Sequence, residues 1–598
     1  MNKTVQSITD RIIARSKDSR AAYLAQMEDA RSSEVSRKIL SCGNLAHAFA
    51  ACAVNEKEDL SGYKTVNLGI VTAYNDMLSA HKPFEDYPKN IREYAQKYHA
   101  VAQVASGVPA MCDGVTQGQK GMELSLLSRD TIALSTAIGL SHNMFDGTIC
   151  LGICDKIVPG LLIGALRFGN LPMLFIPGGP MPSGITNDEK ARIRQAFAEG
   201  KIDREELLKG ESDSYHSAGT CTFYGTANSN QMLLEIMGLQ LPGSSFVNPG
   251  TELRNLLNEY AVKVIAKNAR ERNDTALFKI MDEKVIVNGI VGLLATGGST
   301  NHTLHIVAIA KAAGIIVNWD DFSDLSEVIP SITKVYPNGA ADVNHFHASG
   351  GMAYVMKTLL DHEMLHEDVN TIVGKGLRKY TQEPKITNGE ISYIEGPKET
   401  LNRTILRPVE EPFAAQGGIT VMSGNIGRAI IKTSAVDQTN LSFQAPAIVF
   451  DEQEDLITAF KQDQLNKDFI AVLPFQGPKS NGMPELHKLT PTLTVLLKRG
   501  YKIALITDGR MSGASGKVPA AIHMSPEALD GSILSKITTG DQIIFDVTRK
   551  TANLVDFESI NKREARHLKR ANIGLGTELF ANLRAGISTS ETGASFLY

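Results

Sequence analysis

Apolar and polar positions follow two different patterns along the first third of the chain. Residues 1–60 have the spacing of helices, and after them short apolar runs of strand length alternate with helix-like segments. Strands that alternate with helices are typical of α/β domains with a largely parallel sheet. We therefore predict a helical arm followed by an α/β fold with strands at 66–74, 101–104, 148–153 and 173–176.

The pattern changes twice further along the chain. From about 225 to 380 it is mainly helical, whereas 385–415 is dominated by Gly, Pro and charged residues. Short β-rich runs then lie between Gly-rich turns, at 419–422, 447–450, 470–473, 503–507 and 542–547. They predict a second, β-rich and barrel-like domain. Because 598 residues exceed one hydrophobic core, we place an N-terminal α/β domain at 1–385 and the β-rich domain at 400–598, with the active site between them.

Composition and charge exclude several classes of function. The net charge of -4 gives no reason to expect nucleic acid or an anionic membrane as a partner. No apolar stretch approaches the roughly 20 residues that span a bilayer. The polar N-terminus lacks the apolar region of a secretory signal, so we expect a cytoplasmic location. Thiols stay reduced there, and the six cysteines are therefore predicted to be core residues or metal ligands.

Three of the cysteines lie in sequences typical of loops. Cys112 precedes a Gly-rich stretch, Cys154 ends an apolar run, and Cys221 is flanked by glycines. None has the CxxC spacing of zinc ribbons or ferredoxins. On spacing alone, these three are either ordinary buried thiols or ligands of an iron–sulfur cluster that leaves one iron free. We predict that the other three are core residues: Cys42 and Cys52 in a helical segment, and Cys150 in a strand.

Charged residues directly follow two of these loop cysteines. Asp113 comes after Cys112, and Asp155 and Lys156 come after Cys154. If the two loops converge, the carboxylates form a site for a hard cation beside the thiolates. The alternative is that each Asp caps a turn or a helix. Lys156 is then either a plain salt-bridge partner or an amine modified to carry negative charge.

The C-terminal half offers further candidate groups in turns at strand ends. The turn 476–485 ends in the carboxylate of Glu485, and the strand after it leads to Arg510 and Ser512. A Ser in such a turn is a nucleophile, a base or a structural residue, and no GxSxG pattern of a hydrolase is present. Arg510 can bind a carboxylate or phosphate through its bidentate fork, or it can simply pair with Asp508.

A Gly-rich turn at 297–301 precedes a helical run. Its backbone N–H groups, with Ser299 and Asn301 among them, either hold an anion or only cap the helix. The turn lacks the Walker lysine, so a nucleotide site is not expected. His302 and His305 follow without the spacing of a zincin, and we predict that they do not bind a metal.

Six segments together resemble the dihydroxy-acid dehydratase and 6-phosphogluconate dehydratase family. They occur in order over most of the chain and read CDGVTQGQKGME (112–123), GICDKIVPG (152–160), GTCTFYGTANSNQM (219–232), GGSTNHTLH (297–305), GPKSNGMPE (477–485) and ITDGRMSG (506–513). The segment 223–230 resembles the 6-phosphogluconate branch in particular. The amino-acid-pathway branch typically carries a Cys where this chain has the Cys-free segment 74–81. This departure supports the sugar-acid branch and makes Cys112 the best third cluster ligand.

The resemblance implies two inorganic groups. One is an iron–sulfur cluster bound by Cys154 and Cys221 with Cys112 as the third ligand, expected to be [4Fe-4S] with [2Fe-2S] as the alternative. The other is Mg2+ or Mn2+, held by Asp113, Asp155, Glu485 and a carbamylated Lys156. Ser512 matches the family's proposed base. We further expect the substrate carboxylate or phosphate to contact Ser299, Asn301, Lys479 and Arg510.

The reaction implied by the resemblance is the elimination of water from 6-phospho-D-gluconate, a phosphorylated sugar acid, to give 2-dehydro-3-deoxy-6-phospho-D-gluconate. This is a hydro-lyase step of the Entner–Doudoroff pathway. One alternative is a dehydratase for a non-phosphorylated sugar acid or a dihydroxy acid. Another is a non-enzymatic iron–sulfur sensor, although no DNA-binding motif or basic patch supports it. A homodimer is expected, since dimers are the commonest assembly.

Overall fold

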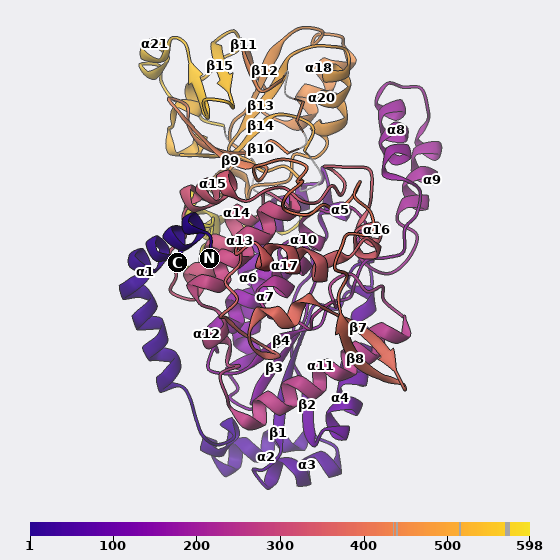
Figure 1. Cartoon of the computed structure of the whole chain (residues 1–598). Helices are drawn as coiled ribbons and strands as arrows, with labels where there is room; N and C mark the ends of the chain where they lie inside the picture. Colours follow the sequence, from indigo (N-terminus) through magenta and orange to yellow (C-terminus); the bar gives the residue numbers. More distant parts are fainter. Residues whose placement is uncertain (435, 438–439, 513–515, 569–573) are drawn as a thin grey trace.

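The computed structural model describes residues 1–434, 436–437, 440–512, 516–568 and 574–598. Its first helices form the predicted arm: α1 (Lys3–Asp29), α2 (Cys42–Ala50) and α3 (Val54–Ser61). α1 runs along the outside of the molecule, and α2 and α3 lie at the end opposite the C-terminal β-rich part (Figure 1). Arg20 of α1 donates to the carbonyl oxygens of Ala313 and Met281, each at 2.7 Å. These bonds attach the arm to the helices of the N-terminal part.

The first sheet has four parallel strands in the order β2–β1–β3–β4. Their bounds are β1 (Val66–Thr72), β2 (Ala100–Gly107), β3 (Gly147–Leu151) and β4 (Met173–Phe175). β1, β3 and β4 are buried along their whole length, as is typical of parallel strands covered by helices on both faces. The predicted parallel sheet is confirmed. Cys154 follows β3, at the carboxyl edge where ligands of such sheets gather.

Helices cover this sheet and build the rest of the N-terminal part. Those that contact the strands include α4 (Tyr87–Lys97), α6 (Ser125–Leu140) and α11 (Glu252–Glu271), and α7 (Ile157–Leu166) packs on α6. α6 and α7 approach closely because Gly160 has no side chain: a Cβ there would lie 2.5 Å from the carbonyl oxygen of Arg129. Among the helices of the described ranges, none combines the length and apolar character needed to cross a membrane.

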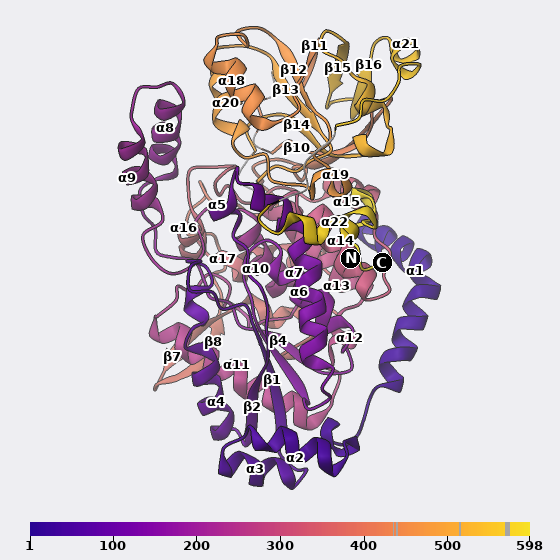
Figure 2. The same cartoon turned by 180° about the vertical axis from the view of Figure 1, so that it is seen from behind.

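The predicted helical stretch after residue 225 is confirmed. It consists of α10 (Thr226–Ile236), α12 (Leu277–Ile280), α13 (Glu283–Thr296), α14 (His302–Ala312), α15 (Trp319–Val328), α16 (Val343–Ala348) and α17 (Gly351–Asp361), together with α11. Before it, α8 (Asn187–Ala198) and α9 (Arg204–Ser214) form a hairpin that projects beside the C-terminal part (Figures 1 and 2). α8 also packs against a helix of that part, α20 (Leu489–Lys498).

Two small antiparallel hairpins lie at or just before the segment 385–415, where Gly, Pro and charged residues dominate the sequence. They are β5 (Asn370–Thr371) with β6 (Gly374–Lys375), and β7 (Gln382–Thr387) with β8 (Glu390–Glu395). The hydrophobic pattern does not predict them, because the strands are short and mostly exposed or half-buried.

The second sheet has eight strands in the order β16–β15–β11–β12–β13–β14–β10–β9. Their bounds are β9 (Ile419–Gly424), β10 (Gly427–Lys432), β11 (Ser442–Val449), β12 (Phe469–Leu473), β13 (Ile503–Thr507), β14 (Ala520–Ser525), β15 (Gln542–Asp546) and β16 (Thr551–Leu554). The strands at the two ends, β16 and β9, contact each other and curl the sheet into a nearly closed barrel. The barrel-like prediction is confirmed, although it did not include β10, β14 and β16.

Side chains of the second sheet alternate between two cores. Ile470 and Val472 of β12 join the interior of the barrel with Phe545, whereas Phe469 packs in the larger core with Leu493 of α20. The other helices of this part are α18 (Gln453–Lys461), α19 (Pro478–Asn481) and α21 (Phe557–Asn561). Burial on both faces explains why β12 and β13 read as continuous apolar runs in the sequence.

The last residues of the chain return to the N-terminal part. After α22 (Ala581–Ala585), Ser595 Oγ and Phe596 N each donate to Asp130 Oδ2 at 2.8 Å. Arg129 Nη2 donates to the carbonyl oxygen of Ala594 at 2.8 Å. The C-terminal segment is therefore fixed against α6, and it places the N- and C-terminal ends of the chain near each other (Figure 2).

The cysteines outside the candidate site agree only partly with the sequence prediction. Cys52 and Cys150 are buried, as predicted, and Cys150 lies inside β3. The prediction that Cys42 belongs to the core is wrong, because Cys42 is the first residue of α2 and is exposed. The Ala-rich composition of α2 suggested a largely buried helix, but most of its side chains are exposed and Leu45 is its buried residue.

A carboxyl in the second domain gives a prediction for the pH dependence of stability. Glu527 is 6% exposed, and its Oε2 accepts from the backbone N of Lys479 at 3.1 Å. Burial, and then the charge of Asp508, raise the pKa of Glu527 from 4.5 to about 8. Between these pH values the folded protein holds a proton that the unfolded chain releases, so this contribution to stability falls as pH rises.

Glu527→Gln should therefore raise thermal stability at high pH and have little effect at low pH. Gln keeps the shape and an acceptor for Lys479 but cannot ionise. We expect the variant to be more stable than the wild type by about 1–3 kcal/mol at pH 8.5, and the difference to vanish near pH 5. Thermal unfolding midpoints at both pH values check this. A difference that does not change with pH would show that Glu527 is ionised in the folded protein.

Candidate active site

The three loop cysteines converge at the carboxyl edge of the first sheet. Cys154 follows β3 in a left-handed conformation, with φ of 77°, which an L-residue adopts only at some cost. Cys112 directly precedes the short helix α5 (Asp113–Thr116), and Cys221 lies in the loop before α10. The thiols of Cys112 and Cys154 share a hydrogen bond, the charge of Cys112 acts to raise the pKa of Cys221, and the charge of Cys221 acts to raise the pKa of Cys154. The structure thus brings together the thiols that the sequence grouped.

The protonation of these thiols reflects their burial and mutual proximity. The hydrogen bond with Cys154 lowers the pKa of Cys112 to about 7, against the effect of burial. The same hydrogen bond and burial raise the pKa of Cys154 well above its usual value. Burial raises the pKa of Cys221 to about 12. Since three thiolates cannot gather here alone, a soft cation is the group that would bind them together.

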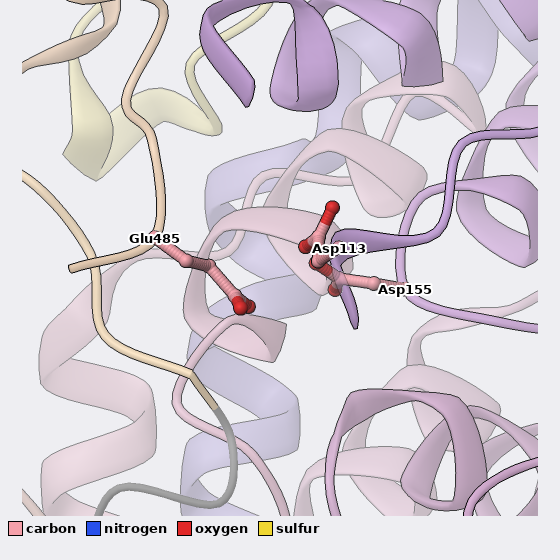
Figure 3. Close-up of side chains that lie close together, drawn as sticks. All are labelled: Asp113, Asp155 and Glu485. Carbon is pink, nitrogen blue, oxygen red and sulfur yellow. The ribbon is translucent and has the colours of Figure 1, made fainter. Parts of the chain in front are cut away.

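Three carboxylates lie beside the thiols. Oxygens of Asp113, Asp155 and Glu485 all lie within 4.8 Å of one another. Asp113 begins α5 and Asp155 lies between β3 and α7, whereas Glu485 comes from the C-terminal domain. Figure 3 shows the Glu485 side chain pointing across to the two aspartates. The two cysteine loops therefore converge, which the sequence left open beside the alternative of capping aspartates, and the site is completed from both halves of the chain.

Two basic side chains contact these carboxylates. Lys156 is fully buried, and its Nζ lies 2.7 Å from Asp155 Oδ2 and in contact with Asp113. Arg510 is 1% exposed and reaches all three acids: its Nη1 lies 2.8 Å from Glu485 Oε1 and 3.0 Å from Asp155 Oδ2, and its Nη2 lies 3.1 Å from Asp113 Oδ2. The alternative that Arg510 pairs with its neighbour Asp508 is therefore wrong. Arg510 pairs instead with three acids that are distant in the sequence.

Burial and neighbouring charges shift the pKa values of this cluster in different directions. Burial, and then the charge of Asp113, raise the pKa of Glu485 to about 8. Burial also acts to raise the pKa of Asp155, but Lys156, His305 and Arg510 together hold it well below its usual range. Burial acts to lower the pKa of Lys156, yet Asp113 and Asp155 raise it overall. The acids therefore attract cations strongly, and a divalent ion would displace the proton from Glu485.

Polar side chains of the Gly-rich turn, α14 and α10 complete the surroundings of Asp155. His305 Nε2 lies 3.0 Å from Asp155 Oδ1, and Asn301 Nδ2 donates to Asp155 Oδ2 at 3.3 Å. Asn230 Nδ2 donates to the carbonyl oxygens of Cys154 (2.8 Å) and Asp155 (3.0 Å), which holds the loop after β3 in place. The role of His305 was missed, although its position in the segment 297–305 is a signal that could have indicated it.

Besides Asn230 Oδ1, two buried amide oxygens at the site have no hydrogen-bond partner among the described residues. They are Asn301 Oδ1 and Gln117 Oε1, and the Nε2 of Gln117 donates to Glu485 Oε2 at 2.7 Å. Buried polar atoms are almost always satisfied, so unpaired acceptors here indicate a group that binds from outside the chain. Hard oxygen donors that surround three carboxylates fit a small divalent cation or a hydroxylated substrate.

The other residues predicted to contact substrate lie at different places. Ser299 is buried and accepts from Thr226 Oγ1 at 2.7 Å and from Asn301 N at 3.2 Å. Lys479 Nζ pairs with Asp530 at 3.0 Å, and the contacts observed for its side chain do not include the carboxylate cluster. Ser512 is half-buried, two residues after Arg510. Gly513, the last residue of the motif 506–513, lies outside the described residues.

The turn 297–301 is held by the protein itself. The N–H groups of Gly297 and Gly298 donate to carbonyl oxygens of α13, and that of Asn301 donates to Ser299 Oγ. Lys432 of β10 donates from Nζ to the carbonyl oxygens of Gly297 (2.9 Å) and Gly298 (3.1 Å). The N–H groups of Gly297 and Gly298 thus cap the carboxyl end of α13, whereas Asn301, the N-cap residue of α14, makes no side-chain capping bond. The contribution of the turn to the site comes from the side chain of Asn301.

Comparison with known proteins identifies the family. The model of the dihydroxy-acid/6-phosphogluconate dehydratase N-terminal domain matches residues 66–380, and that of the C-terminal domain matches 404–594. The chain belongs to the dihydroxy-acid/6-phosphogluconate dehydratase family. This membership makes the protein a dehydratase, that is, a hydro-lyase, and the convergent thiols and carboxylates lie on segments contributed by both matched domains.

Relatives from both branches of the family align over most of the chain. A phosphogluconate dehydratase of Escherichia coli (strain K12) is 55% identical over 599 residues, which cover 100% of this chain and 99% of that protein. The phosphogluconate dehydratase of Zymomonas mobilis is 53% identical over 600 residues, covering 100% and 99%. A dihydroxy-acid dehydratase of Aquifex aeolicus is 31% identical over 528 residues, covering 86% and 90%. The chain is therefore more similar to these two phosphogluconate dehydratases than to the dihydroxy-acid dehydratase of Aquifex aeolicus.

Proposed function

We propose that the protein is a phosphogluconate dehydratase that removes water from 6-phospho-D-gluconate and gives 2-dehydro-3-deoxy-6-phospho-D-gluconate, in the Entner–Doudoroff pathway. The observation that carries the proposal is the identity of 53–55% along the whole chain to phosphogluconate dehydratases of several bacteria. The carboxylate cluster between the domains supports it, since a sugar acid is a polar, anionic substrate that a divalent cation can bind.

We infer that two inorganic groups serve this reaction. Cys112, Cys154 and Cys221 would hold an iron–sulfur cluster, [4Fe-4S] by preference, with one iron left free. Asp113, Asp155 and Glu485 would hold Mg2+ or Mn2+. When bound, these groups supply Lewis acidity to the C3 hydroxyl and to the substrate carboxylate. The fit is supported by the donor types: thiolates suit iron, and carboxylates with amide oxygens suit a hard cation.

We further propose that Lys156 is carbamylated in the loaded enzyme. The ammonium first loses one proton; addition of CO2 to the neutral amine then forms an N–C bond at Nζ and releases a second proton, which turns the cation into an anionic oxygen donor. The position of Nζ supports this, because it already contacts Asp113 and Asp155. Without a bound cation these acids favour the ammonium form instead. Carbamylation and cation binding should therefore depend on each other.

The chain's own residues then perform the proton transfers. We propose that Ser512 Oγ, as an alkoxide, takes the C2 proton of the substrate. The electrons of the C2–H bond form a C2=C3 double bond, the C3–O bond breaks, and the departing hydroxide takes the proton held by Ser512 Oγ to become water, which restores the alkoxide. The resulting enol then tautomerises to the 2-keto acid. Arg510 supports the role of Ser512, since its cationic side chain is two residues away and is anchored on the three carboxylates.

We also propose a cytoplasmic homodimer, in keeping with the free cysteines and with the frequency of dimers among enzymes. The enzyme's partner would be the phosphorylated sugar acid itself, with no nucleic acid or membrane involved. Size-exclusion chromatography with light scattering tests the dimer.

The substrate assignment is tested by assaying the anaerobically purified protein with three acids. We expect keto-acid formation from 6-phospho-D-gluconate with a kcat/KM at least about 100-fold above that for D-gluconate or 2,3-dihydroxyisovalerate, because the lost phosphate contacts are charge-assisted. Equal use of gluconate would support the non-phosphorylated alternative. A brown protein that forms no keto acid from any of the three would support the iron–sulfur sensor.

A further inference from the structure

Lys190 is a buried cation without an acidic partner. It lies on α8 and is 5% exposed, and across the described ranges its ammonium group makes no hydrogen bond or ion pair. Its Nζ lies 5.0 Å from the ring centre of Tyr215 and 5.6 Å from that of Phe223. Ring faces attract the charge but provide no lone-pair acceptor, so the three N–H bonds of the ammonium remain available.

The neighbouring arginine shows the contrast. Arg194 lies one turn further along α8, and its Nη2 donates to Glu211 Oε2 at 2.8 Å on the facing helix α9. Its charge is therefore offset within the hairpin. Lys190 forms no ion pair within the described residues, and Glu211 and Asp342 act to raise its pKa only from a distance. A buried cation without a direct partner is costly to keep. Burial accordingly lowers the pKa of Lys190. A bound anion would remove this cost.

The position of Lys190 relates it to the active site. Lys190 and Cys221 are close enough that the charge of each shifts the pKa of the other. Phe223, which contacts the Lys190 ammonium, is two residues beyond Cys221. Cys112 and Cys154 are each followed directly by a carboxylate of the cation site, whereas Cys221 is followed by Thr222. Lys190 therefore lies beside the thiol that is not joined to the carboxylate cluster.

The substrate of the proposed reaction has an anion at each end. Its C1 carboxylate belongs at the cation site and its reacting C3 hydroxyl at the thiols. Its C6 phosphate must then lie on the side of the thiols away from the carboxylates. We propose that Lys190 binds this phosphate and thereby selects a phosphorylated sugar acid. This inference rests on the proposed function and adds the residue that would distinguish 6-phosphogluconate from gluconate.

The aromatic walls would position the ammonium for this role. Tyr215 and Phe223 hold Nζ between them without forming an ion pair that a phosphate would have to break. The free energy of the charge-assisted bond to phosphate is then not reduced by the loss of an existing ion pair. Lys479, the sequence-based candidate for a phosphate contact, already pairs with Asp530.

Lys190→Gln tests the assignment in the holoenzyme. We expect KM for 6-phospho-D-gluconate to rise about 10- to 100-fold, with kcat little changed, iron and sulfide content unchanged, and slow turnover of D-gluconate unaffected. Inhibition by inorganic phosphate should weaken in parallel. Lys190→Arg keeps the charge and should restore most of the affinity. Lys209→Gln changes an exposed lysine of the same hairpin and should behave as the wild type.

The outcomes separate the inference from the proposed function. If Lys190→Gln keeps the preference for the phosphorylated acid, or loses activity on both acids equally, the assignment of Lys190 is overturned while the substrate stands. If the wild type does not prefer the phosphorylated acid, the proposed substrate is overturned, and this assignment with it. A selective rise in KM that Lys190→Arg reverses supports both.

Discussion

Cys154→Ser is expected to abolish the activity and to remove the iron–sulfur cluster from the anaerobically purified enzyme. The thiol of Cys154 lies in the middle of the proposed ligand set, hydrogen-bonded to Cys112 and close to Cys221. A serine hydroxyl is a hard, weakly acidic donor that does not replace a thiolate on iron. Since a bound Lewis acid contributes several kcal/mol to such reactions, we expect kcat to fall at least about 10³-fold. Iron and sulfide analysis and the visible absorption spectrum measure the cluster directly.

Cys150→Ala is the matched control for this variant. Cys150 lies four residues earlier, inside β3, and is fully buried among apolar side chains. Burial raises the pKa of its thiol far above its usual value, so it is an inert core residue. The control should keep the cluster and most of the activity. A Cys154→Ser enzyme that keeps its full iron content and turns over substrate would contradict the ligand assignment.

The sequence predicts the position of Cys154 for a simple physical reason. A continuous apolar run can only be a buried strand or helix, and the run at 148–153 is too short for a helix and is followed by polar residues, so it predicts a strand with a loop at its carboxyl end. The structure confirms this with β3. Cys150 and Cys52 are likewise buried, but the exposed Cys42 shows that composition alone does not decide which face of a helix packs.

Contacts between distant segments could not be predicted in this way. Arg510 bonds to Asp155, 355 positions away in the sequence, although Asp508 is the nearer acid. Asp508 instead accepts from the backbone N–H groups of Phe475, Gln476 and Ala528, which ties three loops of the β-rich domain together. Only the packing of the two domains decides which acid Arg510 meets, and no local pattern contains that information.

Side chains without a motif were the hardest to predict. Lys190 lies in a charged, helical segment where a lysine is normally solvent-exposed, and only the fold shows it buried between two aromatic rings. His305 was set aside because it lacks the spacing of known metal sites. Its contact with Asp155 depends on the helix after the Gly-rich turn pointing at β3. The family resemblance supplied ligand roles for Glu485 and Lys156 that spacing alone left open.

Asp155→Asn should cost both catalysis and stability. Asp155 is 8% exposed and contacts Lys156 at 2.7 Å, Arg510 at 3.0 Å and His305 at 3.0 Å. An amide removes one of the three negative charges that would hold the divalent cation, and it leaves Lys156 and Arg510 less well neutralised. We expect kcat to fall at least about 10³-fold and the free energy of unfolding to fall by about 3 kcal/mol. Bound Mg2+ or Mn2+ should drop below one per chain, whereas the iron content should remain.

Asp146→Asn separates the two effects. Asp146 is 2% exposed, lies at the opposite end of β3, and pairs with Arg37 at 3.3 Å and Arg272 at 3.2 Å. Its loss should lower stability to a similar extent, because it too neutralises buried arginine, but it should leave the divalent cation and the kcat of the folded fraction unchanged. If the activity of both variants falls only as much as their folded fraction falls, Asp155 serves stability alone and the cation site lies elsewhere. If Asp155→Asn alone loses the cation, its carboxylate is a ligand, and the salt bridges with Lys156 and Arg510 describe how the chain neutralises that carboxylate in the absence of the ion.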